Sequence, residues 1–165
     1  MPFDYEANVA AVVQALTDHN TTTASPDLSS GMTTRVQNIY SADPETVSKR
    51  ADSFPAIFVR ISTKDEEYAS LGQTGPTGNK KMATVTYDVF AFYKKDGTYT
   101  QNQTLLTEVY RLAENIEGVF QAEMKLSNTA LWCNPLRSEF FGPEIIQGVV
   151  VKGLLVELEA KYLFR

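Results

Sequence analysis

The chain offers few of the side chains that usually perform acid–base or nucleophilic chemistry. His19 is the only histidine and Cys133 the only cysteine. His19 follows Asp18 at the expected end of a helix, where the helix dipole favours a cation, so we interpret it as a capping or solvent-exposed residue. Cys133 stands beside Trp132 in an expected strand, which is typical of a buried, unreactive thiol. No second histidine or cysteine is present to complete a zinc site.

A glycine-rich segment, 72–81, bears a superficial resemblance to a phosphate-binding loop. The pattern GxxxxGK[ST] is absent, and Pro76 removes one backbone donor. A strand is expected after the segment, where a phosphate loop requires the start of a helix. The segment therefore indicates a flexible hairpin tip, which can become ordered on contact with a partner.

Charged residues flank this segment on both sides. Asp65, Glu66 and Glu67 precede it, and Lys80 and Lys81 end it. Successive side chains of a strand point to opposite faces, so at most two of the carboxylates converge and a solvated acidic patch is favoured over a metal site. The lysines are expected across a hairpin from the acidic run, where cross-strand or intersubunit ion pairs can form. We predict these five residues as an oligomer or partner interface and assign no catalytic, cofactor-binding or metal-binding residue.

Two amphipathic helices are expected to position these residues. Asp4 is a suitable N-cap for the first helix, which should end near His19-Asn20. The second, over 101–120, has an apolar stripe wide enough to lie on a sheet. A further short helix is predicted over 44–51 from Asp43-Pro44-Glu45. Between them, 21–34 is rich in Thr and Ser and is predicted to be a flexible loop.

Alternating or apolar runs predict the strands, with a turn at Gly142-Pro143-Glu144 joining the last two. In the strand 82–93 the odd positions are apolar, and the far end is expected to be covered on both faces. We predict one domain, 1–165, of the α+β class: a mostly antiparallel sheet of four to five strands packed against two helices, with a long protruding hairpin over 63–81. The predicted strands are 35–40, 56–61, 82–93, 130–140 and 149–164.

The last strand is long for a chain of this size. Sixteen extended residues span about 50 Å, whereas a compact monomer of this length has a diameter of roughly 40 Å. The strand therefore either bends, with Gly153 as the expected bulge, or pairs at its end with a neighbouring copy. We favour the second interpretation, which predicts self-association.

Composition narrows the function classes. With 165 residues, of which 43% are hydrophobic, the chain can bury one ordinary core. A net charge of −5 argues against tight nucleic-acid binding, although it is compatible with a pore through which DNA slides. The single cysteine favours a reducing compartment. No signal peptide or membrane span is expected, and a soluble protein without a membrane partner is predicted.

Four segments, taken in the order of the predicted elements, resemble the tail-terminator and neck proteins of long-tailed bacteriophages. They are Phe54–Val59, Thr84–Phe92, Leu105–Leu112 and Leu154–Leu158. The resemblance implies a virion protein, assembled in the host cytoplasm, that forms a ring, typically hexameric. Such a ring docks on the last ring of the tail tube protein, stops polymerisation and offers a surface to the head-side connector. DNA passes through its lumen without specific binding, and neither an active site nor a cofactor is needed.

Two alternatives stay open. One is another ring of the neck or tail, such as a head-closure or tube protein, because the loop 21–34 and the short helix near Pro44 depart from the simplest layout of the family. A tube protein should grow long polymers, whereas a terminator should stop at one ring. The other is a small ligand-binding domain or enzyme, which a pocket with convergent carboxylates of shifted pKa would support.

Overall fold

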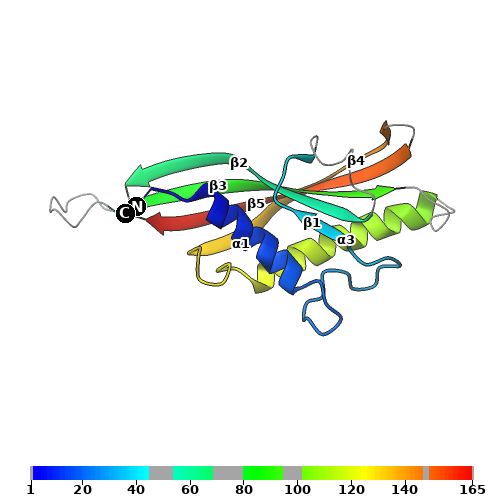
Figure 1. The fold of residues 1–165 in the computed structure, drawn as a ribbon, viewed down its shortest axis with the longest axis horizontal. Coiled ribbons are helices and arrows are strands. Elements are labelled where there is room, and N and C mark those ends of the chain that lie inside the picture. The colour runs from blue at the N-terminus through cyan, green and yellow to red at the C-terminus, as the bar shows by residue number, and fades with distance from the viewer. Residues whose placement is uncertain (1, 45–53, 69–79, 95–101, 147–148, 165) are drawn as a thin grey trace.

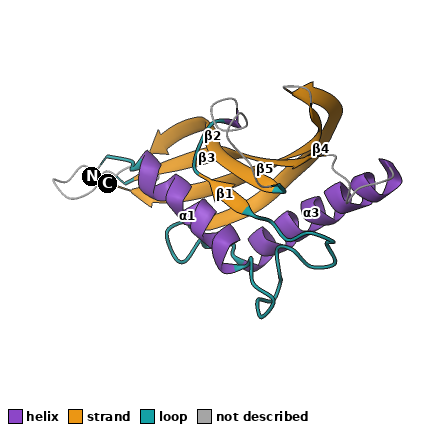
Figure 2. Ribbon diagram, turned by 45° about the vertical axis from the view of Figure 1, so that its right-hand side comes forward, coloured by secondary structure: helices purple, strands orange, loops and turns teal. Residues whose placement is uncertain are grey.

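The computed structural model describes residues 2–44, 54–68, 80–94, 102–146 and 149–164. They form one mixed sheet whose strands run along the long axis of the molecule, with both long helices on one face (Figures 1 and 2). The predicted α+β class is therefore correct. The elements are α1 (Tyr5–Asp18), β1 (Asn38–Tyr40), β2 (Ala56–Tyr68), β3 (Lys81–Lys94), α3 (Asn102–Ala122), β4 (Trp132–Ile146) and β5 (Val149–Phe164).

The sheet has the strand order β1-β2-β3-β5-β4. β1 pairs with β2 in parallel over only three residues, and every other pairing is antiparallel. The prediction of a mostly antiparallel sheet of four to five strands is thus confirmed. The weak strand expected over 35–40 is the short β1, while the predicted helix 44–51 has all but its first residue outside the described residues.

The helices begin and end close to their predicted positions. The Asp4 carboxylate accepts a hydrogen bond from the Ala7 amide at 2.9 Å and caps α1, which ends with His19 as its C-cap. The apolar stripe of α3 is buried against the sheet: Leu105, Val109, Leu112, Ile116 and Phe120. One core therefore fills the space between the two helices and the sheet face that they cover, here called the helix face.

Alternation along β3 and β5 assigns their side chains to the two faces as predicted. On the helix face every odd residue of β3 from Ala83 to Tyr93 is fully buried, and so are the even residues of β5 from Leu154 to Ala160. The opposite face, here called the open face, carries a smaller apolar cluster at one end. Phe92 is buried there between Phe58 and Phe141, with ring centroids 5.6 and 5.8 Å away. The far end of β3 is thus covered on both faces, as expected.

The predicted pairing of the end of β5 with a neighbouring copy stays a prediction, because 162–164 have a described strand partner on the β3 side only. β5 lies inside the sheet, paired with β3 from Val151 to Phe164 and with β4 from Val149 to Lys161. The long strand is accommodated because the whole sheet is elongated, as Figure 1 shows.

Gly153 is not a bulge, because the pairing of β3 with β5 is continuous through it. The residue is small for a different reason: a Cβ atom there would lie 2.1 Å from Cε2 of Phe141 on β4. Likewise, Gly142-Pro143-Glu144 is not the turn between the last two strands. β4 continues through it to Ile146, with a register shift between Phe141 and Glu144, and Gly142 adopts the positive φ of 85° that this irregularity requires.

Replacing Gly153 by Ala should destabilise the protein by about 1–3 kcal/mol, because the Phe141 ring must leave its position on the open face. The matched control is Gly118→Ala within α3, where a new Cβ meets only Pro26 at 4.0 Å and the helix gains up to about 1 kcal/mol. Urea denaturation of both variants measures the difference. Equal midpoints for the two variants would show that the Phe141 contact does not constrain position 153.

The loop predicted over 21–34 has no helix or strand and packs against α3. The side chain of Leu28, in the middle of the loop, is fully buried. Its backbone and one of its side chains bind three polar side chains at helical spacing, Glu108, Arg111 and Asn115. The flexibility predicted for the loop stays a prediction, but its middle has defined attachment points.

For the predicted hairpin over 63–81, the structure describes the arms. β2 and β3 stay paired as far as Tyr68 and Lys81. The tip, 69–79, lies outside the described residues, so the protruding hairpin and the glycine-rich segment stay predictions. Within the described residues, no helix is both long and apolar enough to cross a membrane.

Candidate functional site

The structure brings together two of the five predicted interface residues. The Glu66 carboxylate lies between the ammonium groups of Lys64, with which it forms a close ion pair, and Lys81, 3.3 Å away. Asp65 and Glu67 are exposed and, by strand alternation, belong to the open face. The predicted cross-strand pairing of the acidic run is therefore correct for one carboxylate.

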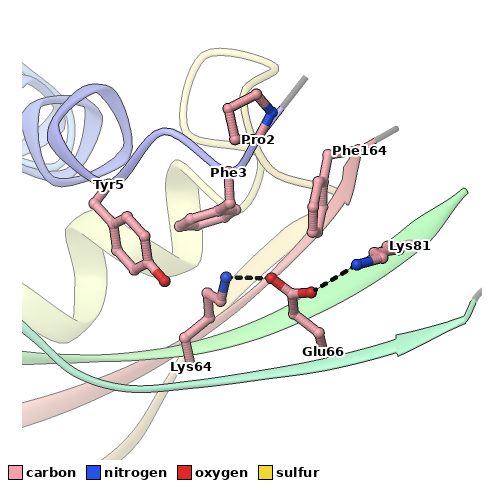
Figure 3. Close-up of a pocket in the computed structure, with 7 residues that line it drawn as sticks. All are labelled: Pro2, Phe3, Tyr5, Lys64, Glu66, Lys81 and Phe164. Atoms are coloured by element: carbon pink, nitrogen blue, oxygen red, sulfur yellow. Dashed lines mark hydrogen bonds and ion pairs between the residues drawn. The ribbon is translucent and has the colours of Figure 1, made fainter.

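A shallow pocket of about 460 Å³ surrounds this ion pair, next to the start of α1 and the end of β5 (Figure 3). The Nζ atom of Lys64 lies 4.9 Å from the ring centroids of both Phe3 and Tyr5, within cation–π range. Sequence reasoning missed Lys64 because its aromatic partners, Phe3 and Tyr5, are distant from it in the sequence. The lining residues are Pro2, Phe3, Tyr5, Lys64, Glu66, Lys81 and Phe164.

The electrostatics of this pocket oppose acid–base chemistry. The hydrogen bond from Lys64 lowers the pKa of Glu66, with Lys81 acting in the same direction. The same bond, together with one to Tyr5, raises the pKa of Lys64. Glu66 thus stays ionised and Lys64 stays an ammonium, whereas a general acid or an amine nucleophile needs the opposite shifts. The arrangement can hold a charged group, and its pKa shifts are opposite to those that a general acid or an amine nucleophile needs.

The contacts of His19 and Cys133 indicate that both residues serve the fold. The His19 ring contacts the Pro26 carbonyl oxygen at 2.7 Å and a Glu123 carboxylate oxygen at 3.3 Å, which ties the end of α1 to the end of α3. Cys133 is fully buried, and burial raises the pKa of its thiol to about 12. Its interpretation as a buried thiol is confirmed. The described residues contain no group of three or more His, Cys, Asp or Glu arranged to hold a metal ion.

Sequence reasoning missed the two carboxylates that are buried among the described residues. Asp88 on the open face pairs with Arg60, the residue directly opposite it on β2, at 3.1 Å. Glu108 of α3 accepts hydrogen bonds from the amide and hydroxyl groups of Thr33 at 3.0 and 2.9 Å. A signal for Glu108 was present, because it lies one turn from both Leu105 and Leu112 of the apolar stripe. Both carboxylates are neutralised or hydrogen-bonded, so they serve the fold.

The sheet ends in two free stretches of strand edge on opposite sides. β4 is the last strand of its side, so its outer edge has no partner among the described strands. On the other side β1 covers only 56–58 of β2, which leaves the outer edge of β2 from Val59 to Tyr68 without a described strand partner. Free edges present rows of backbone N–H and C=O groups that can pair with another chain.

Exposed apolar side chains accompany the β4 edge. Ile145 is 76% exposed, and Phe140, which is 43% exposed, stacks edge-to-face on Tyr110 of α3 with ring centroids 4.9 Å apart. A groove of about 300 Å³ follows the β2 edge, lined by Val59, Arg60 and Ile61 and by residues of α1 and 41–43. The two outer edges of the sheet thus differ: the β4 edge carries projecting apolar side chains, whereas the β2 edge is followed by a groove.

Comparison with known proteins adds no assignment. No protein-family model matches the chain, and no curated protein matches it significantly.

Proposed function

We propose that this chain is a structural virion protein of a long-tailed bacteriophage, which forms a homo-oligomeric ring at the end of the tail tube. In this proposal the ring, a hexamer in the simplest case, docks on the last ring of tube protein and stops its polymerisation. Its other side receives the head-side connector, and DNA passes through the lumen.

The observation that carries the proposal is the pair of unlike free edges on opposite sides of one sheet. Contact between two different surfaces of the same chain is heterologous, and it produces a closed ring when the rotation between copies closes. Residues 132–146 form a long edge with exposed apolar side chains, and in a soluble monomer such an edge is an aggregation hazard unless a partner covers it.

Two further features support the proposal. The described order of α1, loop, β2, β3, α3, β4 and β5 agrees with the order on which the resemblance to tail-terminator and neck proteins rests, and the short β1 is additional to it. The net charge of −5 suits a channel wall along which DNA must slide without being held. In the pocket that contains predicted site residues, the single carboxylate is neutralised by two lysines, which favours an assembly role over catalysis.

Electron microscopy of the purified protein, alone and mixed with tail tubes, tests the proposal. Closed annuli that bind tube ends and prevent their further growth are the expected result. Compact single particles that ignore tubes would contradict the ring and its role. Long polymers of the protein alone would instead identify a tube subunit.

A further inference from the structure

We propose that β4 of one copy adds to the free outer edge of β2 in the next copy, in antiparallel orientation, with Arg137 facing Asp65. This inference rests on the proposed ring and names its contact surfaces. It also gives Asp65, on the exposed acidic run of β2, a specific partner.

Strand direction supports the pairing. β3 is antiparallel to both β2 and β5, and β5 is antiparallel to β4, so the two edge strands β2 and β4 run in opposite directions. A second copy in the same orientation therefore presents its β2 antiparallel to β4 of the first. The backbone groups of both edges can then form the usual antiparallel ladder.

The irregularities of β4 limit the length of this ladder. Register shifts lie between Pro135 and Arg137 and between Phe141 and Glu144. Prolines and bulges interrupt edge pairing, since they remove a donor and twist the strand away. The regular stretch between the shifts is 137–141, so we place the ladder with the next copy on these residues.

Charge selects one register within that stretch. Arg137 and Glu139 of β4 lie on the open face, because Arg137 is directly opposite Glu157, which is itself opposite Asp88. On β2 the open face carries Asp65 and Glu67. Placing Arg137 opposite Glu67 would put Glu139 opposite Asp65, where like charges repel.

Placing Arg137 opposite Asp65 instead brings Glu139 opposite uncharged Thr63. Arg137 already contacts Glu157 and Glu139, but its side chain is 59% exposed, so a further carboxylate can reach it. This register therefore has one attractive pair and no directly opposed like charges on the open face.

The same register gives the exposed Phe140 a place to bind. Phe140 belongs to the helix face, since its ring contacts Tyr110 of α3. β2 has a register shift of its own between Ile61 and Thr63, so with Arg137 opposite Asp65 the Phe140 side chain lies opposite this irregularity, at Ser62 and Ile61. Ile61 lines the groove of about 300 Å³ between β2 and α1, whose walls include the apolar Val59 and Val9. Inserting the ring there removes apolar surface from water on both copies.

Sedimentation analysis of two matched variants at micromolar concentration tests the pairing. Phe140 and Leu163 are 43% and 44% exposed, but Leu163 lies on β5, opposite Met82 of β3, and takes no part in the proposed contact. We expect Phe140→Lys to abolish the oligomer and Leu163→Lys to preserve it.

Cysteine cross-linking provides a second readout that does not depend on the folding of the lysine variant. Asp65→Cys and Arg137→Cys chains, mixed under oxidising conditions, should form a disulfide-linked pair, whereas Asp65→Cys mixed with Glu114→Cys should not. A ring that survives Phe140→Lys and gives no Asp65–Arg137 cross-link would overturn the edge pairing and leave the proposed function standing. A wild-type chain that remains monomeric would overturn both.

Discussion

Raising the pH from 8 to 11 should lower the free energy of unfolding by about 5 kcal/mol, which is comparable with the whole stability of many domains. Three buried groups cause the loss. Burial raises the pKa of the Cys133 thiol and of the Tyr162 hydroxyl to about 12. Burial, together with the charge and hydrogen bond of Tyr162 at 2.6 Å, also raises the pKa of Tyr87.

The sign follows from proton binding. The unfolded chain releases these protons at ordinary pKa values, near 9 for cysteine and 10 for tyrosine, whereas the folded chain retains them. The unfolded state therefore binds fewer protons above pH 9, and each group lowers stability by about 1.4 kcal/mol per pH unit until its own folded pKa is reached. Below pH 9 both states keep these protons, so the three groups cause no loss of stability there.

Guanidinium denaturation at pH 8, 9, 10 and 11 measures this effect, and Cys133→Ala is the matched control. In that variant the decline between pH 9 and 10 should largely disappear, while the decline above pH 10, which comes from the tyrosines, remains. Unfolding free energies that stay level through pH 11, or identical slopes for the two proteins between pH 9 and 10, would contradict the assignment.

The faces of the elements could be predicted from sequence, because alternation and helical periodicity are local properties of the chain. The odd residues of the strand 82–93 and the stripe of the helix 101–120 are buried as predicted. Pairing partners were harder to predict, since they depend on contacts between distant segments. β1 illustrates this: three residues joined to β2 in parallel carry almost no periodic signal.

The two glycine errors have the same origin. Gly153 and Gly142 were interpreted from local chain geometry, as a bulge and a turn. In the structure the first accommodates the Phe141 ring from a neighbouring strand, and the second belongs to an irregularity inside a longer β4. A glycine indicates that a side chain is not tolerated at its position, but the reason depends on tertiary contacts that the local sequence does not show.

The candidate interface was partly predictable. The acidic run and Lys81 marked one side of the sheet, and Glu66 indeed pairs with Lys81. The β4 edge was not recognised, because periodicity says which face of a strand is buried and nothing about whether the strand lies at an edge. The length of β5 predicted pairing between copies at its end, whereas the long strand edges without a described partner belong to β2 and β4.

Replacing Glu108 by Ala should destabilise the protein by about 3 kcal/mol, the largest effect we expect from a single polar substitution. The Glu108 side chain is 2% exposed and accepts hydrogen bonds from both the amide and the hydroxyl of Thr33. Arg111, one turn along α3, lies 3.7 Å from the carboxylate. Hydrogen bonds to a charged group contribute about 1.5–3 kcal/mol each, and the variant also leaves the Thr33 amide without its acceptor.

Two further variants distinguish the loss of the Glu108–Thr33 hydrogen bonds from a general effect of substitution on α3. Thr33→Ala removes the hydroxyl but keeps the amide, so it should cost about half as much as Glu108→Ala. Glu114→Ala, at an exposed position on the same helix, should change stability by no more than about 0.5 kcal/mol. Urea denaturation measures the free energy of unfolding of the three variants.

Limited proteolysis adds a local readout for the loop 21–34. If Glu108 is its attachment point, Glu108→Ala should be cleaved in this loop faster than Glu114→Ala under conditions in which both remain folded, because local opening then requires less free energy. Equal cleavage rates, or a destabilisation of Glu108→Ala below about 1 kcal/mol, would mean that buried Leu28 and the hydrogen bonds from Arg111 and Asn115 hold the loop without Glu108.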